Sequence, residues 1–303
     1  MTLETRVGGG RVTLMGFPID AFDEAEAVST IVEGALEGRG GLVVTPNVDH
    51  LRRLQLDAHF RHAYERADVV LADGMPLVWA SRLQGPRLPC RVAGSNLLWS
   101  LSAAAADVGL PIFLLGGRPG SADATAKVLL ARSPHLRIVG CAVPEVGFEK
   151  DPRQLERLVE DIREATGEAA SGIVFLALGT PKQELLAARL VDTIHDVWLV
   201  GVGAAFDMAA GRVRRAPSWA QRSGLEWLFR LAQEPKRLFR RYVIEDAPFT
   251  VKLFTASAKE RWRARTVRQW PERRLPVGTR SAVAAPTHRP VSHRRGCGAP
   301  RSG

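Results

Sequence analysis

The sequence predicts an α/β fold: a Rossmann-like, open and mainly parallel sheet covered by helices, followed by a basic helical appendage. Short apolar runs alternate with amphipathic helical stretches, the order typical of parallel strands joined by helices. Several runs are apolar throughout, as expected when helices cover both faces of a sheet. Charge predicts the appendage, because residues 212–303 hold 22 Lys or Arg against 6 Asp or Glu, whereas the whole chain carries +10.

Alternating strands and helices are expected along the N-terminal part of the chain. The strands are expected at residues 11–16, 41–45, 68–72, 111–115, 137–141, 172–178 and 197–202. The helices are expected at residues 23–37, 49–66, 95–108, 121–132, 152–166 and 183–194. We expect these elements to form one α/β domain over residues 1–211.

The C-terminal part has a different pattern. Ser218 begins a capping-box pattern, which predicts a helix there, and Pro235 suits the first turn of a second helix. A third stretch, residues 249–266, is basic and amphipathic. These helices form the expected appendage, residues 212–266. Residues 271–303, rich in Arg, Pro, Ala and Ser without periodicity, are expected to be disordered.

Composition limits the setting in which the protein works. The three isolated cysteines predict neither a disulfide framework nor a zinc site, as is typical of the reducing cytosol. The first residues lack a signal pattern, and no segment approaches the ~18 uninterrupted apolar residues of a membrane-spanning helix. We therefore expect a cytoplasmic protein whose membrane contact, if any, is peripheral. The basic C-terminal third suits polyphosphate, nucleic acid or an anionic membrane surface.

Glycines, acids and amides follow five of the expected strands. The segments are residues 45–49 (TPNVD), 72–76 (ADGMP), 116–120 (GGRPG), 179–184 (GTPKQE) and 203–207 (GAAFD). In open parallel sheets, ligands bind outside the carboxyl ends of the strands. A purely structural sheet needs turn glycines but not this many carboxylates and amides, so we expect a ligand site at this edge.

Two of these segments, 116–120 and 179–184, are glycine-containing turns that lead into helices. Such turns present free backbone N–H groups and a positive dipole end to a phosphate, although each alone could be a plain connecting turn. Two turns in one sheet favour a nucleotide or diphosphate ligand. The segment 201–206 lacks the third glycine of the dinucleotide fingerprint, and the Walker pattern is absent, so neither NAD binding nor a P-loop is expected.

Asp73 is the carboxylate that stands out, because it ends an apolar strand and is followed by Gly74. A partly desolvated carboxylate there would have a raised pKa and could act as a general base. The alternative is an Asp that only caps the next helix, which is the more frequent role after a strand.

No metal is expected to be required. The chain has no DxD and no HExxH motif, and His59 and His62 lie on a charged helix that suits a solvated face. Arg or Lys must then neutralise a leaving diphosphate. Arg230, Arg237 and Arg240 lie at helical spacings and could converge on an anion, although a solvated basic face is the usual role of such a run.

At these residues the chain resembles the WecB/TagA/CpsF glycosyltransferases, glycosyltransferase family 26. The matching strings are TPNVDH at 45–50, RADVVLADGMPLVWASR at 66–82, RVAGS at 91–95, LLGGRPG at 114–120, FLALGTPKQE at 175–184 and the whole segment 200–242. The resemblance extends from about residue 11 to about residue 245 and leaves residues 246–303 outside.

The resemblance implies inverting transfer of a hexose or N-acetylhexosamine from a UDP-sugar to a polyprenyl-diphosphate-linked saccharide. This would serve exopolysaccharide or teichoic-acid-like synthesis at the cytoplasmic face of the cell membrane, without a metal. It implies that Asp73 is the general base and that Thr45, Asn47, Arg91 and Gln183 line the sugar and acceptor pocket. It implies that Gly116, Gly117, Gly179, Gly203, Asp207, Arg230, Arg237 and Arg240 hold UDP. The appendage would be a lid that contacts an anionic membrane.

Some alternatives stay open. Asp49 stands where many members have Glu, which leaves the donor sugar undecided among glucose, glucuronic acid and N-acetylmannosamine or its uronate. A non-catalytic UDP-sugar-binding module is a second hypothesis, and a basic nucleic-acid-associated α/β protein is a third. No nucleic-acid recognition motif occurs in the sequence, so nucleic acid is not an expected partner. The oligomeric state is open, a homo-oligomer included.

Overall fold

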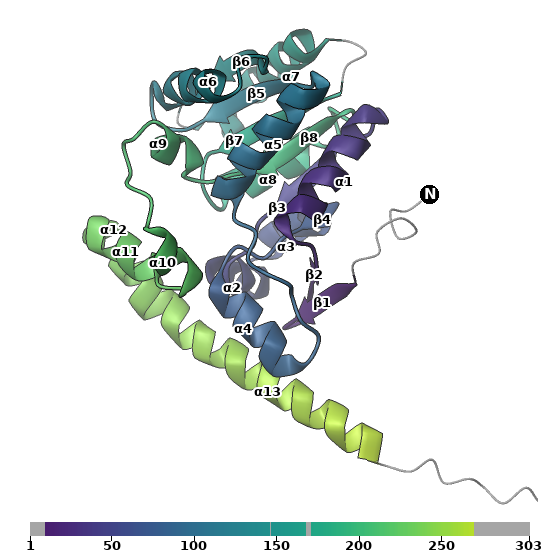
Figure 1. Cartoon of the computed structure of the whole chain (residues 1–303), viewed down its shortest axis with the longest axis vertical. Coiled ribbons are helices and arrows are strands. Elements are labelled where there is room, and N and C mark those ends of the chain that lie inside the picture. Colours follow the sequence, from purple (N-terminus) through teal and green to yellow (C-terminus); the bar gives the residue numbers. More distant parts are fainter. Residues whose placement is uncertain (1–9, 146, 168–170, 270–303) are drawn as a thin grey trace, which may run out of the picture.

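The computed structural model describes residues 10–145, 147–167 and 171–269 (Figure 1). Its centre is a six-stranded sheet in which every pairing is parallel, in the order β4-β3-β8-β7-β5-β6. The strands are β3 (Gly41–Val44), β4 (Val69–Val70), β5 (Pro111–Gly116), β6 (Arg137–Ala142), β7 (Gly172–Ala177) and β8 (Val197–Gly201). The predicted Rossmann-like α/β fold is confirmed.

Helices cover both faces of this sheet. They are α1 (Glu24–Leu36), α2 (Val48–Leu56), α3 (Ala58–Glu65), α4 (Met75–Gln84), α5 (Gly94–Val108), α6 (Ser121–Arg132), α7 (Pro152–Thr166), α8 (Lys182–Leu190) and α9 (Ala205–Ala209), with a 3-10 turn, η2 (Phe148–Lys150). One core contains buried residues of α1, α5, α6 and α9, and the other contains buried residues of α2, α3, α7 and α8. Successive residues such as Val174 and Phe175 join opposite cores, which explains why the strands are apolar throughout.

A strand forms within the expected residues 11–16, but the prediction that it belongs to the main sheet is wrong. The chain turns at Met15 and Gly16, both with positive φ (53° and 92°). It forms an antiparallel hairpin of β1 (Arg11–Leu14) and β2 (Phe17–Asp20) outside the main sheet. A two-residue turn of this kind requires positive φ, which a methionine adopts rarely, so no residue pattern predicted the turn.

Two further differences concern helices near the site. The expected helix at 49–66 is divided at Asp57, which is extended, ends α2, and accepts hydrogen bonds from the first N–H groups of α3. Helix α4 was not expected, and it begins directly after Asp73 and Gly74.

The C-terminal helices lie across the carboxyl-end side of the sheet (Figure 1). They are α10 (Ser218–Arg222), α11 (Glu226–Gln233), α12 (Pro235–Phe239), a π-helical turn η3 (Arg240–Asp246) and α13 (Ala247–Gln269). Helix α13 packs along α4, and its Phe249 and Leu253 are buried in the core that includes the β1–β2 hairpin. No helix in the described residues combines the length and apolarity needed to cross a bilayer. The expectation for residues 271–303 lies outside the described residues, and the domain boundary at 211/212 stays a prediction.

Candidate active site

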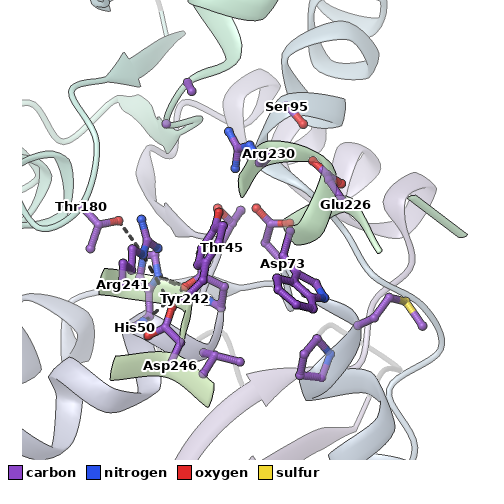
Figure 2. A pocket seen from close by; sticks show the side chains of 18 of the residues that line it. Thr45, His50, Asp73, Ser95, Thr180, Glu226, Arg230, Arg241, Tyr242 and Asp246 are labelled. Carbon is purple, nitrogen blue, oxygen red and sulfur yellow. Dashed lines mark hydrogen bonds and ion pairs between the residues drawn. The ribbon is translucent and has the colours of Figure 1, made fainter. Parts of the chain in front are cut away.

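A cleft of 460 Å³ opens between the carboxyl ends of the strands and the C-terminal helices (Figure 2). The α/β part contributes Thr45, Asn47, Asp73, Arg91 and Gln183 to its wall. The C-terminal helices contribute Glu226, Arg230, Arg241 and Tyr242. The structure therefore brings together the expected base and the four residues expected to line the sugar and acceptor pocket, and it places the C-terminal helices against them.

Asp73 faces this cleft with an unpaired carboxylate. Its backbone N–H donates to the carbonyl of Pro46 (2.8 Å), which ties the loop after β4 to the loop after β3. No donor among the described residues hydrogen-bonds its carboxylate, and α4 is capped by Gly74 without a side-chain bond, so Asp73 is not a helix cap. Burial raises the pKa of Asp73 above its ordinary value, against the opposing charge of Arg91. A carboxylate in this state can accept a proton from a substrate hydroxyl.

Arg91 and Glu226 form an ion pair beside Asp73. Both side chains are largely buried, and Glu226 reaches the pair from the start of α11. Burial alone would lower the pKa of Arg91, but the carboxylates of Asp73 and Glu226 raise it. Glu226 was not predicted from the sequence. The feature that could have indicated it is its place as an isolated acid in a strongly basic segment.

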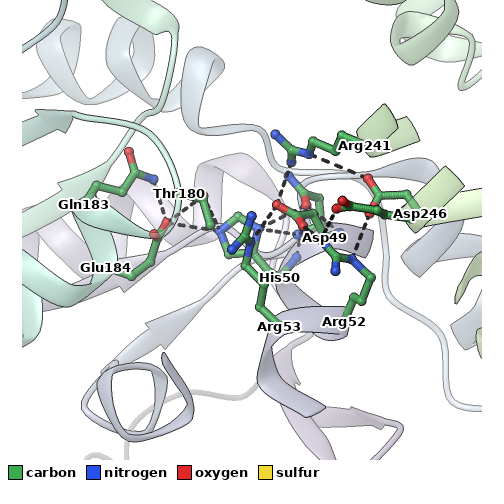
Figure 3. A network of polar contacts seen from close by, with 11 residues as sticks. Asp49, His50, Arg52, Arg53, Thr180, Gln183, Glu184, Arg241 and Asp246 are labelled. Atoms are coloured by element: carbon green, nitrogen blue, oxygen red, sulfur yellow. Dashed lines mark hydrogen bonds and ion pairs between the residues drawn. The ribbon is translucent and has the colours of Figure 1, made fainter. Parts of the chain in front are cut away.

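Gln183 and Asn47 are held by a buried pair, His50 and Glu184 (Figure 3). The amide of Gln183 donates to Glu184 Oε1 (2.8 Å), and its oxygen accepts from the Gly203 N–H (3.1 Å). His50 contacts Glu184 through Nε2 (3.1 Å) and Asn47 Oδ1 through Nδ1 (3.0 Å). Burial would raise the pKa of Glu184, but His50 and Gln183 lower it below its ordinary value. This pair thus orients both amides of the cleft.

We expect Glu184→Ala to lower the free energy of unfolding by about 1–3 kcal/mol, because it removes the buried partner of the Gln183 amide and of the His50 ring. Urea unfolding measures the change. Glu160→Ala, on the exposed side of α7, is the matched control and should change stability by less than about 0.5 kcal/mol. Equal stabilities of the two variants would contradict this structural role.

A second network joins α2 to η3 (Figure 3). Asp49 is fully buried and pairs with Arg52 (2.7 Å), Arg53 (3.0 Å) and Arg241 (3.2 Å). Burial would raise the pKa of Asp49, but these guanidinium groups, Arg241 foremost, lower it. Asp246 lies between Arg52 (3.5 Å) and Arg241 (3.6 Å). Asp49 therefore holds the C-terminal helices to the α/β part and does not itself line the cleft. The position where many members have Glu and this chain has Asp49 thus concerns the attachment of these helices.

The raised pKa of Asp246 should make the free energy of unfolding depend on pH. Burial and the carboxylate of Asp49 raise its pKa to about 6, against Arg241 and Arg52. A carboxyl whose folded pKa is raised stabilises the fold most when it is protonated, and this contribution is lost as pH rises through about 6. Relative to Asp246→Asn, which does not titrate, the wild type should lose roughly 3 kcal/mol of unfolding free energy between about pH 4 and about pH 7.5. Urea unfolding at both pH values measures the difference, and a pH-independent difference would contradict the placement.

The residues expected to bind UDP divide into two groups. Gly179, Gly203 and Arg230 line the cleft. Gly116, Gly117 and Asp207 do not line it: the Gly117 N–H donates to the carbonyl of Ala177 (2.9 Å), and Asp207 accepts from the Ser121 hydroxyl (2.7 Å). Gly116 has a φ of 101°, and a Cβ there would come within 3.0 Å of the Ala177 backbone. These contacts are those of a plain connecting turn, and the UDP-binding role of the two glycines stays a prediction.

The arginines of the C-terminal helices that were expected to bind UDP also differ in position. Arg240 has a side chain that is 82% exposed, pairs with Glu245 (3.3 Å), and lies outside the cleft, where the neighbouring Arg241 takes its place. The side chain of Arg237 lies outside the described residues. Residues 240–246 are π-helical, and the wider turn changes which residue faces the cleft relative to α-helical spacing. That change could not be read from the sequence.

No group of three or more His, Cys, Asp or Glu is placed to hold a metal ion within the described ranges. The charged side chains at the cleft that could bind an anion are arginines: Arg91, Arg230 and Arg241. The arrangement combines a proton acceptor, hydrogen-bonding amides and cationic groups in one cleft, which can take a proton from a hydroxyl and bind an anion.

A comparison with protein-family models matches residues 12–263 to the glycosyl transferase WecG/TagA/CpsF family. The chain belongs to this family. It is therefore a glycosyltransferase of a family involved in cell-surface polysaccharide synthesis, as the motifs indicated. One expectation is corrected: the family match includes residues 246–263, which the motif resemblance left outside. The matched range therefore includes Asp246 and most of α13.

Proposed function

We propose that the protein is an inverting glycosyltransferase that moves a hexose or N-acetylhexosamine from a UDP-sugar to a polyprenyl-diphosphate-linked saccharide, in exopolysaccharide or teichoic-acid-like synthesis. One observation carries this proposal: an unpaired carboxylate with a raised pKa, Asp73, faces a cleft that arginines also line. Family membership supports the sugar transfer, and the charges of the cleft support an anionic donor.

In the proposed reaction, the acceptor hydroxyl attacks the anomeric carbon of the donor sugar while Asp73 takes its proton. The bond between that carbon and the diphosphate oxygen breaks on the opposite side, and its electron pair leaves with UDP. A single displacement of this kind inverts the anomeric configuration. Arg230 neutralises the charge that develops on the leaving diphosphate, so that no metal is needed. Thr45, Asn47 and Gln183 hold sugar hydroxyls.

We further propose that the protein works on the cytoplasmic face of the membrane, attached through its C-terminal helices. Trp219, Phe239 and Trp262 on these helices are 64%, 53% and 68% exposed, among many basic residues. Exposed tryptophans next to Lys and Arg are typical of surfaces that bind anionic lipid headgroups. Flotation with vesicles that contain anionic lipid, but not with neutral vesicles, would support this attachment.

The test of the proposed function is a donor screen with a short prenyl-diphosphate-linked sugar as acceptor. UDP release is measured with UDP-glucose, UDP-glucuronic acid and UDP-N-acetylmannosamine in separate reactions. We expect release that depends on the acceptor with at least one donor. Binding of UDP without acceptor-dependent release from any donor would favour the non-catalytic UDP-sugar-binding module instead.

A further inference from the structure

The cleft has a polar half and an apolar half. The polar half contains Asp73 and the amides described above. The apolar half is formed by the start of α4 and by facing side chains of the C-terminal helices. Its side chains are Met75, Pro76, Trp79, Trp227 and Leu238. The uracil ring of a sugar nucleotide stacks on one aromatic side chain, whereas this wall combines two tryptophans with three aliphatic residues.

The apolar wall begins next to the proposed base. Met75 and Pro76 follow Asp73 at the first turn of α4, and Trp79 comes one helical turn later. Trp79 is covered by the turn between α10 and α11: a Cβ on Gly224 would lie 2.7 Å from its ring. Gly224 has a φ of 73°, so this close approach of backbone to indole uses a residue without a side chain. The wall is thus shared between the α/β part and the C-terminal helices.

The two tryptophans of the wall lie at the mouth of the cleft. Trp79 and Trp227 both line it, yet they are 40% and 44% exposed. Trp227 also packs edge-on against Tyr242, another lining residue, with a centroid distance of 6.3 Å. Leu228, next to Trp227, is 48% exposed. An apolar path of lining side chains therefore extends from Met75, beside Asp73, to two tryptophans that are partly exposed.

We propose that this apolar half binds the first prenyl units of a prenyl diphosphate, with Trp79 and Trp227 as its walls. The inference rests on the proposed function, and it assigns residues to the lipid part of the acceptor. Arg230 is assigned to UDP, so Arg241, which lines the same cleft, suits the diphosphate of the prenyl lipid, and the aromatic and aliphatic wall suits its hydrocarbon. A ligand that is anionic at one end and apolar at the other matches both halves at once. The path to the surface lets the rest of a long chain leave the cleft.

Two soluble probes test the proposal by calorimetry: farnesyl diphosphate, and inorganic diphosphate as the head group alone. The wild type should bind farnesyl diphosphate at least about tenfold more tightly than diphosphate, because several apolar carbons are removed from water. Trp79→Ala and Trp227→Ala, on opposite walls, should each lose most of this preference and keep the affinity for diphosphate. The retained affinity also shows that each variant is folded.

Leu36→Ala is the control for loss of an exposed apolar side chain, since Leu36 is 58% exposed on α1 and does not line the cleft. It should keep the full preference for farnesyl diphosphate. Equal affinities of the wild type for the two probes, or an unchanged preference in both wall variants, would overturn the proposal. The donor screen separates the two claims: sugar transfer without a farnesyl preference overturns this inference alone. A farnesyl preference that depends on Trp79, without transfer from any donor, supports the prenyl site and contradicts the proposed transfer.

Discussion

Asp73→Asn is expected to lower the kcat of sugar transfer by about 10²–10⁴-fold, the usual contribution of a general base. The amide has nearly the same shape but cannot take the proton of the acceptor hydroxyl. UDP binding should be unchanged, because the proposed diphosphate ligand Arg230 is untouched. Initial rates of UDP release and calorimetry with UDP measure the two quantities.

The pH dependence of the wild type provides a second readout on the same residue. Since burial raises the pKa of Asp73 and the base must be ionised to act, kcat should fall as pH is lowered through that raised pKa. Asp161→Asn, on the exposed side of α7, is the control and should keep the wild-type rate and pH profile. Turnover close to wild type in Asp73→Asn would remove Asp73 from the role of base.

Arg230→Ala is expected to lower kcat by about 10²–10³-fold, as is typical when a group that stabilises developing charge is removed. Arg230 lines the cleft and forms no hydrogen bond or ion pair with the other residues that the structure describes. Its guanidinium is therefore available to a substrate, and its loss should leave the unfolding free energy nearly unchanged. Arg230→Lys keeps the charge and should recover part of the rate.

Arg240→Ala is the matched comparison, because Arg240 belongs to the same basic segment but points away from the cleft. Steady-state kinetics of the two alanine variants should differ clearly, with Arg240→Ala within about threefold of the wild type, a change of less than about 0.7 kcal/mol in the barrier. A loss in Arg240→Ala as large as that in Arg230→Ala would mean that the C-terminal helices rearrange around UDP and bring Arg240 into the cleft.

The sheet and the polar half of the site could be predicted because their causes are local in sequence. Apolar runs define the buried strands, and the carboxyl ends of parallel strands meet at one edge. Thr45, Asp73 and Gly203 each follow a strand by one to three residues, so their convergence in one cleft follows from the topology. The hairpin at residues 11–20 escaped prediction because its turn depends on a methionine with positive φ.

The rest of the site depends on contacts between distant parts of the chain. Glu226 meets Arg91 across 135 residues, and His50 meets Glu184 across 134. Arg241 faces the cleft only because residues 240–246 form a π-helical turn fastened to Asp49. Burial, pairing and helix phase of this kind are set by tertiary packing, and no local pattern in the sequence specifies them.

The anomeric configuration of the product tests the central claim most directly. With the donor that gives UDP release, the coupling constant of the anomeric proton in the product is measured by NMR and compared with that of the UDP-sugar. A single displacement with Asp73 as base predicts the opposite configuration in product and donor. Retention of the donor configuration would contradict the mechanism, because it requires two displacements or attack from the side of the leaving UDP.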